Sequence, residues 1–271
     1  MSYDVVTITV AYRKNDKVAE MLGSLFLDIA GSGLNIKSVV VDNASGANFG
    51  ETLKEKFPQV DNILNQTNTG YGVANNIAFG RYEAKYYFII NPDITFPAGQ
   101  NIIKRFYDFM EANPKIGLAG PKLILSDGDI QPSCQRFPKF LDQPIFRLEL
   151  HKKYNWARKR VEKFQMADFS HNKPVPVDWV VGAAFFIRSA ALAKVGGFDE
   201  RYFAYFEDCD LCREFWEAGW PVFYKADISL LHGHERSSAK IPGLRSIFQN
   251  KLTRIHLKSW LQYWLKWQKT E

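Results

Sequence analysis

The chain has 271 residues, of which 46% are hydrophobic, and it carries a net charge of +6. Its size and apolar content are ample for the core of a globular enzyme, as one large domain or two small ones. No run of about 18 uncharged apolar residues occurs, and residues 5–10 lack the basic leader and cleavage site of a signal peptide, so we expect a cytoplasmic protein without a membrane span.

The first 120 residues alternate between strand and helix patterns. Short β-branched or apolar runs predict strands at residues 5–10, 37–41, 62–64 and 86–90. Apolar residues at helical spacing predict helices between them, at residues 17–29, 49–57 and 72–81. Strands separated by helices pair in parallel through right-handed crossovers, so this half predicts a Rossmann-type nucleotide-binding sheet.

The second half of the chain is less regular. We expect a helix at residues 99–111, a strand at 116–119, and then hairpin-like pieces and a polar, basic stretch at 131–176 where an acceptor-specific insertion would sit. Strands are predicted at residues 177–187 and 221–224, and helices at 189–195, 208–218 and 244–267. No repeat or low-complexity linker divides the chain. The simplest organisation is one domain, residues 1–240, followed by a C-terminal helical segment, residues 241–271.

The positive charge is concentrated in two stretches. Residues 147–164 carry a net charge of +5 and residues 251–271 carry +4, which leaves −3 for the rest of the chain. Such local basicity points to particular surfaces that meet phosphates or anionic lipid. It argues against general nucleic-acid binding, and we expect no nucleic-acid partner.

Acidic residues stand at the ends of predicted elements. Asp42 and Asp93 follow predicted strands, and Glu207 and Asp208 open a predicted helix. Open α/β sheets bind ligands beyond the carboxyl ends of their strands, so Asp42 and Asp93 are expected to face one crevice. This arrangement suits an enzyme that holds a nucleotide diphosphate through a metal and deprotonates an incoming hydroxyl.

Five segments, in this order, resemble motifs of the inverting glycosyltransferases of family 2. They lie at residues 9–12 (TVAY), 40–45 (VVDNAS), 68–76 (NTGYGVANN), 91–94 (NPDI) and 196–211 (GGFDE, then YFEDCDL). The resemblance spans residues 5–237 and favours bacterial rhamnosyltransferase-like members, which use dTDP-L-rhamnose. It implies an α/β GT-A fold with a mostly parallel central sheet flanked by helices, to which the amphipathic C-terminal helix would be appended.

The resemblance places the nucleotide sugar against the motifs of the first half. It implies that Asp42 accepts the imide N–H of uracil or thymine, although an Asx turn would use the same carboxylate. The glycines and amides at residues 68–76 suit an anionic ligand at a helix start, or else a simple Gly-rich turn. Asn75 and Asn76 are favoured over Tyr71 as ligand contacts. The nucleotide-sugar residues assigned in this half are Ala11, Tyr12, Asp42, Asn68, Gly72, Asn75, Asn91 and Asp93.

Asn91-Pro92-Asp93 occupies the family's DxD position, with Asn in place of the first Asp. A hard divalent ion such as Mg²⁺ or Mn²⁺ takes few protein ligands when phosphates supply the rest, so Asp93 could suffice, with Asn91 on the ribose or a metal-bound water. By resemblance, His232 is a further metal ligand, and Arg236 clamps the diphosphate. An ordinary Asn-Pro-Asp turn and a structural histidine are the alternatives.

Glu207 and Asp208 stand at a helix start, where the macrodipole is expected to keep both ionised at neutral pH. The family pattern makes Asp208 the general base that accepts the proton of the acceptor hydroxyl, and Glu207 the residue that orients acceptor or base. The alternative is a pair of acids that only satisfy the helix dipole. Asp210 and Glu214 are expected on a solvated face.

Weaker signals surround this pair. Gly182 could let the sugar and diphosphate approach the backbone, and Trp179 could stack on a sugar, whereas a packed core strand is the simpler explanation. Cys209 and Cys212 have the CxxC spacing of a redox or zinc half-site, but no second cysteine pair accompanies them and the segment is acidic. We expect two reduced thiols beside the core.

The C-terminal helix is expected to be amphipathic, with Leu257, Trp260, Leu261, Trp264 and Trp267 on one side and Lys258, Gln262, Lys266 and Lys269 on the other. A basic helix rich in tryptophan can lie in a bilayer interface, which would fit a lipid-linked acceptor and a peripheral position on the inner face of the cell membrane. The stripe could equally dock on the protein or on a second subunit of a homodimer.

Together these features predict a metal-dependent inverting glycosyltransferase. Its donor would be dTDP-L-rhamnose, and its acceptor a hydroxyl of a bacterial cell-surface glycan or lipid-linked saccharide precursor. A UDP-hexose donor and a non-catalytic nucleotide-sugar binding module are the alternatives. A glycosidase would need two carboxylates flanking a sugar bond and no nucleotide machinery, which the motifs of the first half oppose.

Overall fold

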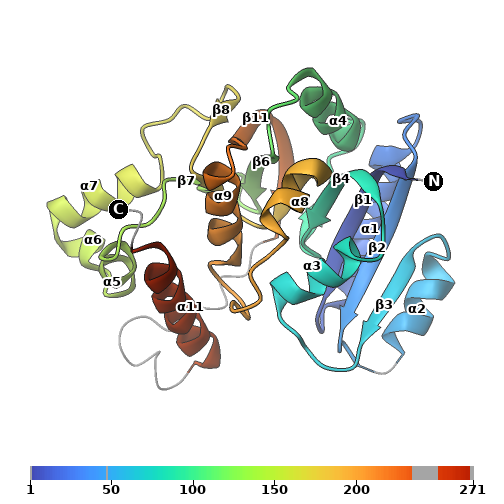
Figure 1. Ribbon diagram of the computed structural model, residues 1–271, viewed down its shortest axis with the longest axis horizontal. Helices are drawn as coiled ribbons and strands as arrows, with labels where there is room; N and C mark the ends of the chain where they lie inside the picture. Colours follow the sequence, from blue (N-terminus) through green and yellow to red (C-terminus); the bar gives the residue numbers. More distant parts are fainter. Residues whose placement is uncertain (1, 47, 234–249, 269–271) are drawn as a thin grey trace.

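The computed structural model describes residues 2–46, 48–233 and 250–268. Its parallel half has the strand order β3-β2-β1-β4 (Figure 1). The strands are β1 (Tyr3–Ala11), β2 (Ile36–Asn43), β3 (Asp61–Asn65) and β4 (Ala84–Ile90), and the helices between them are α1 (Asn15–Ile29), α2 (Phe49–Lys56) and α3 (Tyr71–Phe79). This alternation confirms the Rossmann-type half that the sequence predicts.

The second half adds antiparallel strands to the same sheet. β10 (Ala184–Arg188) runs antiparallel between β4 and β6 (Leu118–Leu125), and β11 (Val222–His232) lies parallel to β6. Two short strands, β5 (Ile94–Thr95) and β8 (Val175–Pro176), pair with β11, while β7 (Cys134–Gln135) and β9 (Trp179–Val180) form a separate ribbon. The single strand predicted at residues 177–187 is therefore two strands, because the backbone leaves one sheet at Val180 and joins the other at Ala184.

Both faces of the sheet are covered, which explains why residues 86–90 of β4 form a continuous apolar run. Tyr86 and Phe88 pack on one face with α1 and α4 (Ile102–Ala112). Tyr87 and Ile89 pack on the other face with α3, α8 (Ser189–Val195) and α9 (Glu207–Glu217). Side chains alternate across a strand, so a strand buried on both faces needs apolar residues at every position.

Residues 131–176 contain three short helices beside the sheet. These are α5 (Asp142–Arg147), α6 (Leu150–Lys153) and α7 (Asn155–Phe164), which share a small core of Ile145, Ala157 and Val161. Pro144 lies in the first turn of α5, a position where proline costs no helical hydrogen bond. Pro144 is therefore compatible with the helix.

The C-terminal helix α11 (Lys251–Trp267) docks on α9, which is one of the alternatives left open for it by the sequence. Its buried positions are Thr253, Ser259, Tyr263 and Trp267. Lys266 also faces the protein, where its ammonium lies 2.7 Å from both Asp210 and Glu214. The expected division of faces, with Lys266 opposite Trp267, is thus wrong, and so is the solvated face expected for Asp210, which is 1% exposed. Lys269 and residues 234–249 lie outside the described residues.

Among the described residues, no helix combines the length and hydropathy needed to cross a bilayer. The thiols of Cys134, Cys209 and Cys212 are unpaired with one another and buried, as expected for reduced thiols beside the core. Burial raises the pKa of Cys209 and Cys212, which keeps both thiols protonated.

Candidate active site

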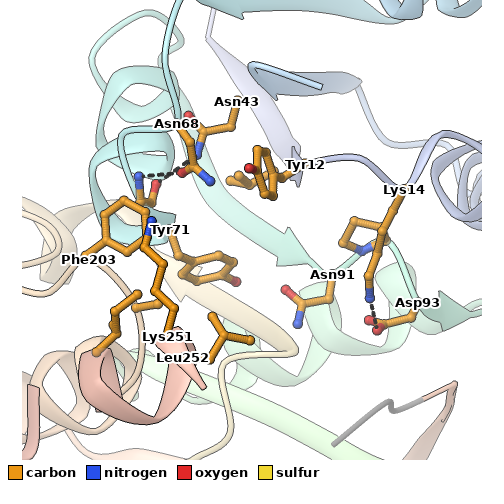
Figure 2. A pocket seen from close by; sticks show the side chains of 15 residues that line it. Tyr12, Lys14, Asn43, Asn68, Tyr71, Asn91, Asp93, Phe203, Lys251 and Leu252 are labelled. Carbon is orange, nitrogen blue, oxygen red and sulfur yellow. Dashed lines mark hydrogen bonds and ion pairs between the residues drawn. The ribbon is translucent and has the colours of Figure 1, made fainter. Parts of the chain in front are cut away.

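A cavity of about 420 Å³ opens where the carboxyl ends of β1, β2 and β4 meet the start of α3 (Figure 2). The expected site residues Tyr12, Asn68, Asn91 and Asp93 line it. Its other lining residues are Val10, Lys14, Asn43, Gly70, Tyr71, Pro92, Phe203, Ala204, Lys251, Leu252 and Ile255. The last three belong to the first turns of α11, so the C-terminal helix forms part of the cavity wall.

Strand pairing brings Asp93 and His232 together from distant parts of the sequence. β5 pairs with the end of β11 so that Ile94 lies opposite His232. His232 Nε2 then lies 3.4 Å from one oxygen of Asp93. Lys14 Nζ lies 3.0 Å from the other oxygen (Figure 2). Burial alone would raise the pKa of Asp93, but His232 and Lys14 outweigh it and hold that pKa well below its ordinary value. Asp93 is therefore a carboxylate at neutral pH.

Gln131 orients the imidazole of His232. Its Oε1 lies 2.6 Å from His232 Nδ1, and both side chains are buried. This contact fixes the ring so that Nε2 points toward Asp93, and a neutral ring held in this way could ligate a metal through Nε2 if the same metal also bound the Asp93 carboxylate.

The Asp93 and His232 pair suits two protein ligands of a divalent ion. Adjacent oxygen or nitrogen ligands at about 2.1 Å from a metal lie about 3 Å apart, close to the 3.4 Å between Nε2 and the Asp93 oxygen. Among the described residues no group of three or more His, Cys, Asp and Glu side chains could hold a metal. The two donors would therefore depend on substrate phosphates or water for the remaining positions.

Asp208 lies in the first turn of α9, is partly exposed, and is not among the residues that line the cavity. One of its oxygens accepts a hydrogen bond from Gly182 N at 3.0 Å, and the other accepts from Cys209 N at 2.8 Å. Burial raises the pKa of Asp208, against the lowering effect of these two hydrogen bonds. A carboxylate has about four acceptor positions, so each oxygen retains one for a substrate hydroxyl.

Glu207 differs from the expectation that both acids are ionised. It is 9% exposed, and one of its carboxyl oxygens is buried without a hydrogen-bond partner. Burial, followed by the negative charge of Asp208, raises the pKa of Glu207 to about 8. Desolvation thus outweighs the helix dipole, and Glu207 is largely protonated at neutral pH.

The backbone before α9 is strained. Tyr205 and Phe206 both have φ of +68°, in the left-handed region that side chains with a Cβ rarely adopt. Packing holds them there, since the Phe206 ring lies 5.3 Å from the ring of Tyr263 on α11. Strain of this kind is retained where surrounding structure fixes it, often at a functional site.

Tyr71, rather than Asn75 or Asn76, reaches the cavity from α3. Its hydroxyl donates to the carbonyl of Gly182 at 2.7 Å, and Gly182 N in turn donates to Asp208. Burial, and then the carboxylates of Glu207 and Asp208, raise the pKa of Tyr71 well above its ordinary value. Asn75 is fully buried and donates to the Tyr71 carbonyl, while Asn76 bonds the backbone of Phe198. The helix turns both amides away from the cavity, so they support α3.

A network of amides shapes the wall near Asn68. Asn43 Nδ2 donates to Asn68 Oδ1 at 2.9 Å, and Asn43 Oδ1 accepts from the backbone of Thr69. Asp42 lies beneath this network, is 1% exposed, and accepts from Ser45 N at 2.7 Å. That bond is a local turn contact like the Asx turn weighed against a base contact, although it reaches the N–H three residues on rather than two, and Asp42 is absent from the cavity lining.

Other expected site residues serve packing. Ala11 is fully buried in β1. A Cβ on Gly72 would lie 2.9 Å from the Phe198 side chain, and a Cβ on Gly182 would lie 2.9 Å from Asp208 Cβ. These glycines therefore permit close packing within the protein. The indole of Trp179 donates to the Arg136 carbonyl at 3.0 Å, and Arg236 lies outside the described residues.

A family model described as Glycosyl transferase family 2 matches residues 6–173, and one described as Glycosyl transferase family group 2 matches residues 146–268. The chain belongs to glycosyl transferase family 2. It is accordingly a glycosyltransferase, and the family assignment made from the motif order is confirmed.

Rhamnosyltransferases are among the relatives of this family member. The N-acetylglucosaminyl-diphospho-decaprenol L-rhamnosyltransferase of Mycobacterium tuberculosis is 26% identical, over 96% of this chain and 87% of its own length. The rhamnosyltransferase WbbL of Escherichia coli K12 is 36% identical over a shorter region, 32% of this chain and 30% of its own length.

Solved structures confirm the GT-A fold. The crystal structure of S. aureus TarS 1-349 superposes with a TM-score of 0.56 at 15% identity, over 86% of this chain and 60% of that one. The crystal structure of GalNAc-T7 with UDP, GalNAc and Mn²⁺ gives a TM-score of 0.59 at 12% identity, over 86% of this chain and 44% of that one.

The residues at or near the cavity of this glycosyltransferase that were not predicted from the sequence include Lys14, Gln131, Phe203 and Lys251. Lys14 is the second residue after the TVAY motif and could have been suspected from that position. The other three reach the site through long-range packing, for which the sequence carries no local signal.

Proposed function

We propose that this glycosyltransferase transfers L-rhamnose from dTDP-L-rhamnose to a hydroxyl of a lipid-linked precursor of a bacterial surface glycan. The observation that carries the proposal is the match to a rhamnosyltransferase of a diphospho-decaprenol-linked sugar along 96% of the chain. The cavity supports it, since polar side chains of Tyr12, Asn68 and Asn91 line one side and the apolar Leu252 and Ile255 line another.

In the proposed reaction Asp208 is the general base. The acceptor hydroxyl attacks the anomeric carbon from the face opposite the diphosphate, so one C–O bond forms as the bond to the diphosphate breaks. The hydroxyl proton passes to Asp208, and the configuration at the anomeric carbon inverts. Neutral Glu207 leaves Asp208 as the anionic member of the pair, which spares the site a repulsion between adjacent carboxylates.

The metal belongs to the proposal as well. Asp93 and His232 would hold Mg²⁺ or Mn²⁺, and the bound ion would neutralise charge on the departing diphosphate. Lys14 pairs with the same carboxylate and would have to move aside or turn to the diphosphate. Asn68, Asn91 and Tyr12 are the proposed nucleotide-sugar contacts. For Asp42 to bind the base, the Ser45 contact would have to open.

The test compares Asp208→Asn with Glu217→Gln, an exposed acid on the same helix. Loss of a general base lowers turnover with dTDP-L-rhamnose by about 10²- to 10⁴-fold, whereas the control keeps wild-type turnover. The substitution at 208 also removes a backbone hydrogen bond, worth about 1–3 kcal/mol, so thermal unfolding is followed separately. A folded Asp208→Asn protein with wild-type turnover would contradict the assignment.

Calorimetry with dTDP and UDP, each with and without Mn²⁺, separates donor choice from chemistry. Tight binding of dTDP without any product would favour a nucleotide-sugar binding module. Preference for UDP would favour a UDP-hexose donor. A screen of nucleotide sugars for thermal stabilisation identifies the sugar, because a bound donor raises the melting temperature by mass action.

A further inference from the structure

An aromatic and basic surface covers α5–α7 and the outer side of α11. Of the fourteen large hydrophobic residues that are exposed in the described part of the chain, eight lie on these helices and the turns beside them. They are Phe140, Leu141, Phe146, Leu148, Tyr154, Trp156, Leu261 and Leu265. We call this region the α5–α11 surface. Single exposed apolar residues scattered over a protein are normal, whereas a cluster of them on one face is typical of an interaction site.

Direct contacts make one continuous face of these distant segments. The Phe140 ring lies 4.7 Å from Trp260 and 5.1 Å from Trp264 of α11. The guanidinium of Arg147 on α5 donates to the hydroxyl of Thr253 on α11. Figure 1 shows α5–α7 beside α11, at the end of the molecule away from β3.

The charge of the α5–α11 surface is strongly positive. Residues 139–164 carry a net charge of +5 and residues 251–268 carry +4, while the rest of the chain sums to −3. Lys153, Lys159 and Lys258 are exposed and extend from three different helices or turns of this region. Exposed leucine and tryptophan next to exposed lysine is the pattern of a protein face that lies in a membrane interface.

We infer that the α5–α11 surface docks on an anionic lipid bilayer, with Trp156, Leu261 and Leu265 in the interface and the lysines at the headgroups. A second copy of the chain fits this face less well, because a twofold interface would set the same positive surface against itself. An anionic membrane instead complements the charge and accepts the apolar side chains.

The same helix connects this face to the cavity. Leu252 and Ile255 line the cavity. Leu265 lies ten residues beyond Ile255 on α11, which is about 15 Å along the helix axis. A docked enzyme would therefore hold the cavity close to the bilayer, within reach of a lipid-linked acceptor. This last consequence rests on the proposed function, whereas the docking itself does not.

The experiment measures co-sedimentation of the full chain with phosphatidylcholine vesicles, with and without phosphatidylglycerol. Two variants test the surface. The lysine variant combines Lys153→Gln, Lys159→Gln and Lys258→Gln, and the leucine variant combines Leu261→Gln and Leu265→Gln. The control for the lysine variant carries three Lys→Gln changes at the exposed residues Lys54, Lys56 and Lys115, and the control for the leucine variant carries two Leu→Gln changes at the exposed Leu27 and Leu64. Each basic residue at an anionic surface changes the partition coefficient by about fivefold, so the lysine variant should lose about 100-fold.

The docking surface is supported if the wild-type protein and both controls bind vesicles that contain phosphatidylglycerol and the two test variants do not. It is overturned if the wild type does not bind, if the controls lose as much as the test variants, or if the test variants change only the oligomeric state in ultracentrifugation. Vesicle binding needs no donor or acceptor, so a protein that binds vesicles and transfers no rhamnose would refute the proposed function and leave the surface standing.

Discussion

Glu207→Gln should make the stability of the protein less sensitive to pH. The folded protein raises the pKa of this buried acid from 4.5 to about 8. A carboxyl group with a raised folded-state pKa contributes its full stability below the unfolded pKa, and that contribution is lost as pH rises through the folded pKa. Between pH 5 and pH 7 the wild type should lose about 3 kcal/mol through Glu207, at about 1.4 kcal/mol per pH unit.

Glutamine keeps the size and neutrality of the protonated acid but does not titrate, so the variant escapes this loss. With an unfolding entropy of about 2.1 cal/mol/K per residue, 3 kcal/mol corresponds to about 5 °C for 271 residues. Calorimetric melting temperatures at several pH values give the difference between variant and wild type. Glu217→Gln, exposed at the end of the same helix, should follow the wild type. If the difference in melting temperature between Glu207→Gln and the wild type stays constant from pH 5 to pH 7, Glu207 is not a buried neutral acid in the folded protein.

Two further predictions concern contacts that the sequence did not reveal. Lys266→Met leaves the 1%-exposed Asp210 without its ammonium partner and should lower the free energy of unfolding, measured in urea, by about 3–5 kcal/mol. Lys258→Met, on the exposed side of the same helix, should change it little, and equal losses of stability in the two variants would show that the buried ion pair has no special role. Gln131→Leu removes the partner of His232 Nδ1 and should weaken Mn²⁺ binding by about 10- to 100-fold in calorimetry, while dTDP binding in the absence of metal stays unchanged. A variant that binds Mn²⁺ as tightly as the wild type would exclude the orienting role of Gln131.

The parallel half of the fold was predictable because each element carries its own local pattern. The strand residues alternate between two covered faces, and α1 repeats its buried residues at helical spacing, as Val18, Met21, Leu22 and Leu25 show. The second half was harder, since β10 and β11 acquire their neighbours through long connections. The length of β11 beyond residue 224 follows from pairing with β6 and β5, which no local pattern encodes.

The candidate site shows the same division. The motifs located Asp93 and Asp208, and the structure adds what surrounds them: Lys14 and His232 on one, Gly182 on the other. Motif reasoning assigned ligand contacts to Asn75 and Gly72, but the helical turn directs the first into the core and Phe198 occupies the space beside the second. A motif fixes which residues occur together, whereas burial decides which of their atoms face solvent.

The position of α11 ties the proposed base to the proposed docking face. Asp210, two residues after Asp208, accepts from Trp267 Nε1 at 2.7 Å and from Tyr202 at 3.1 Å, so the first turn of α9 is anchored to the end of α11. The opposite side of α11 carries Leu261 and Leu265 toward solvent. Because α11 bonds Asp210 on its inner side and exposes Leu261 and Leu265 on its outer side, it would hold Asp208 at a fixed distance from a membrane on which the α5–α11 surface docks. That geometry suits an acceptor whose hydroxyl stands at a set distance from its lipid, because effective base catalysis needs the proton within hydrogen-bond reach.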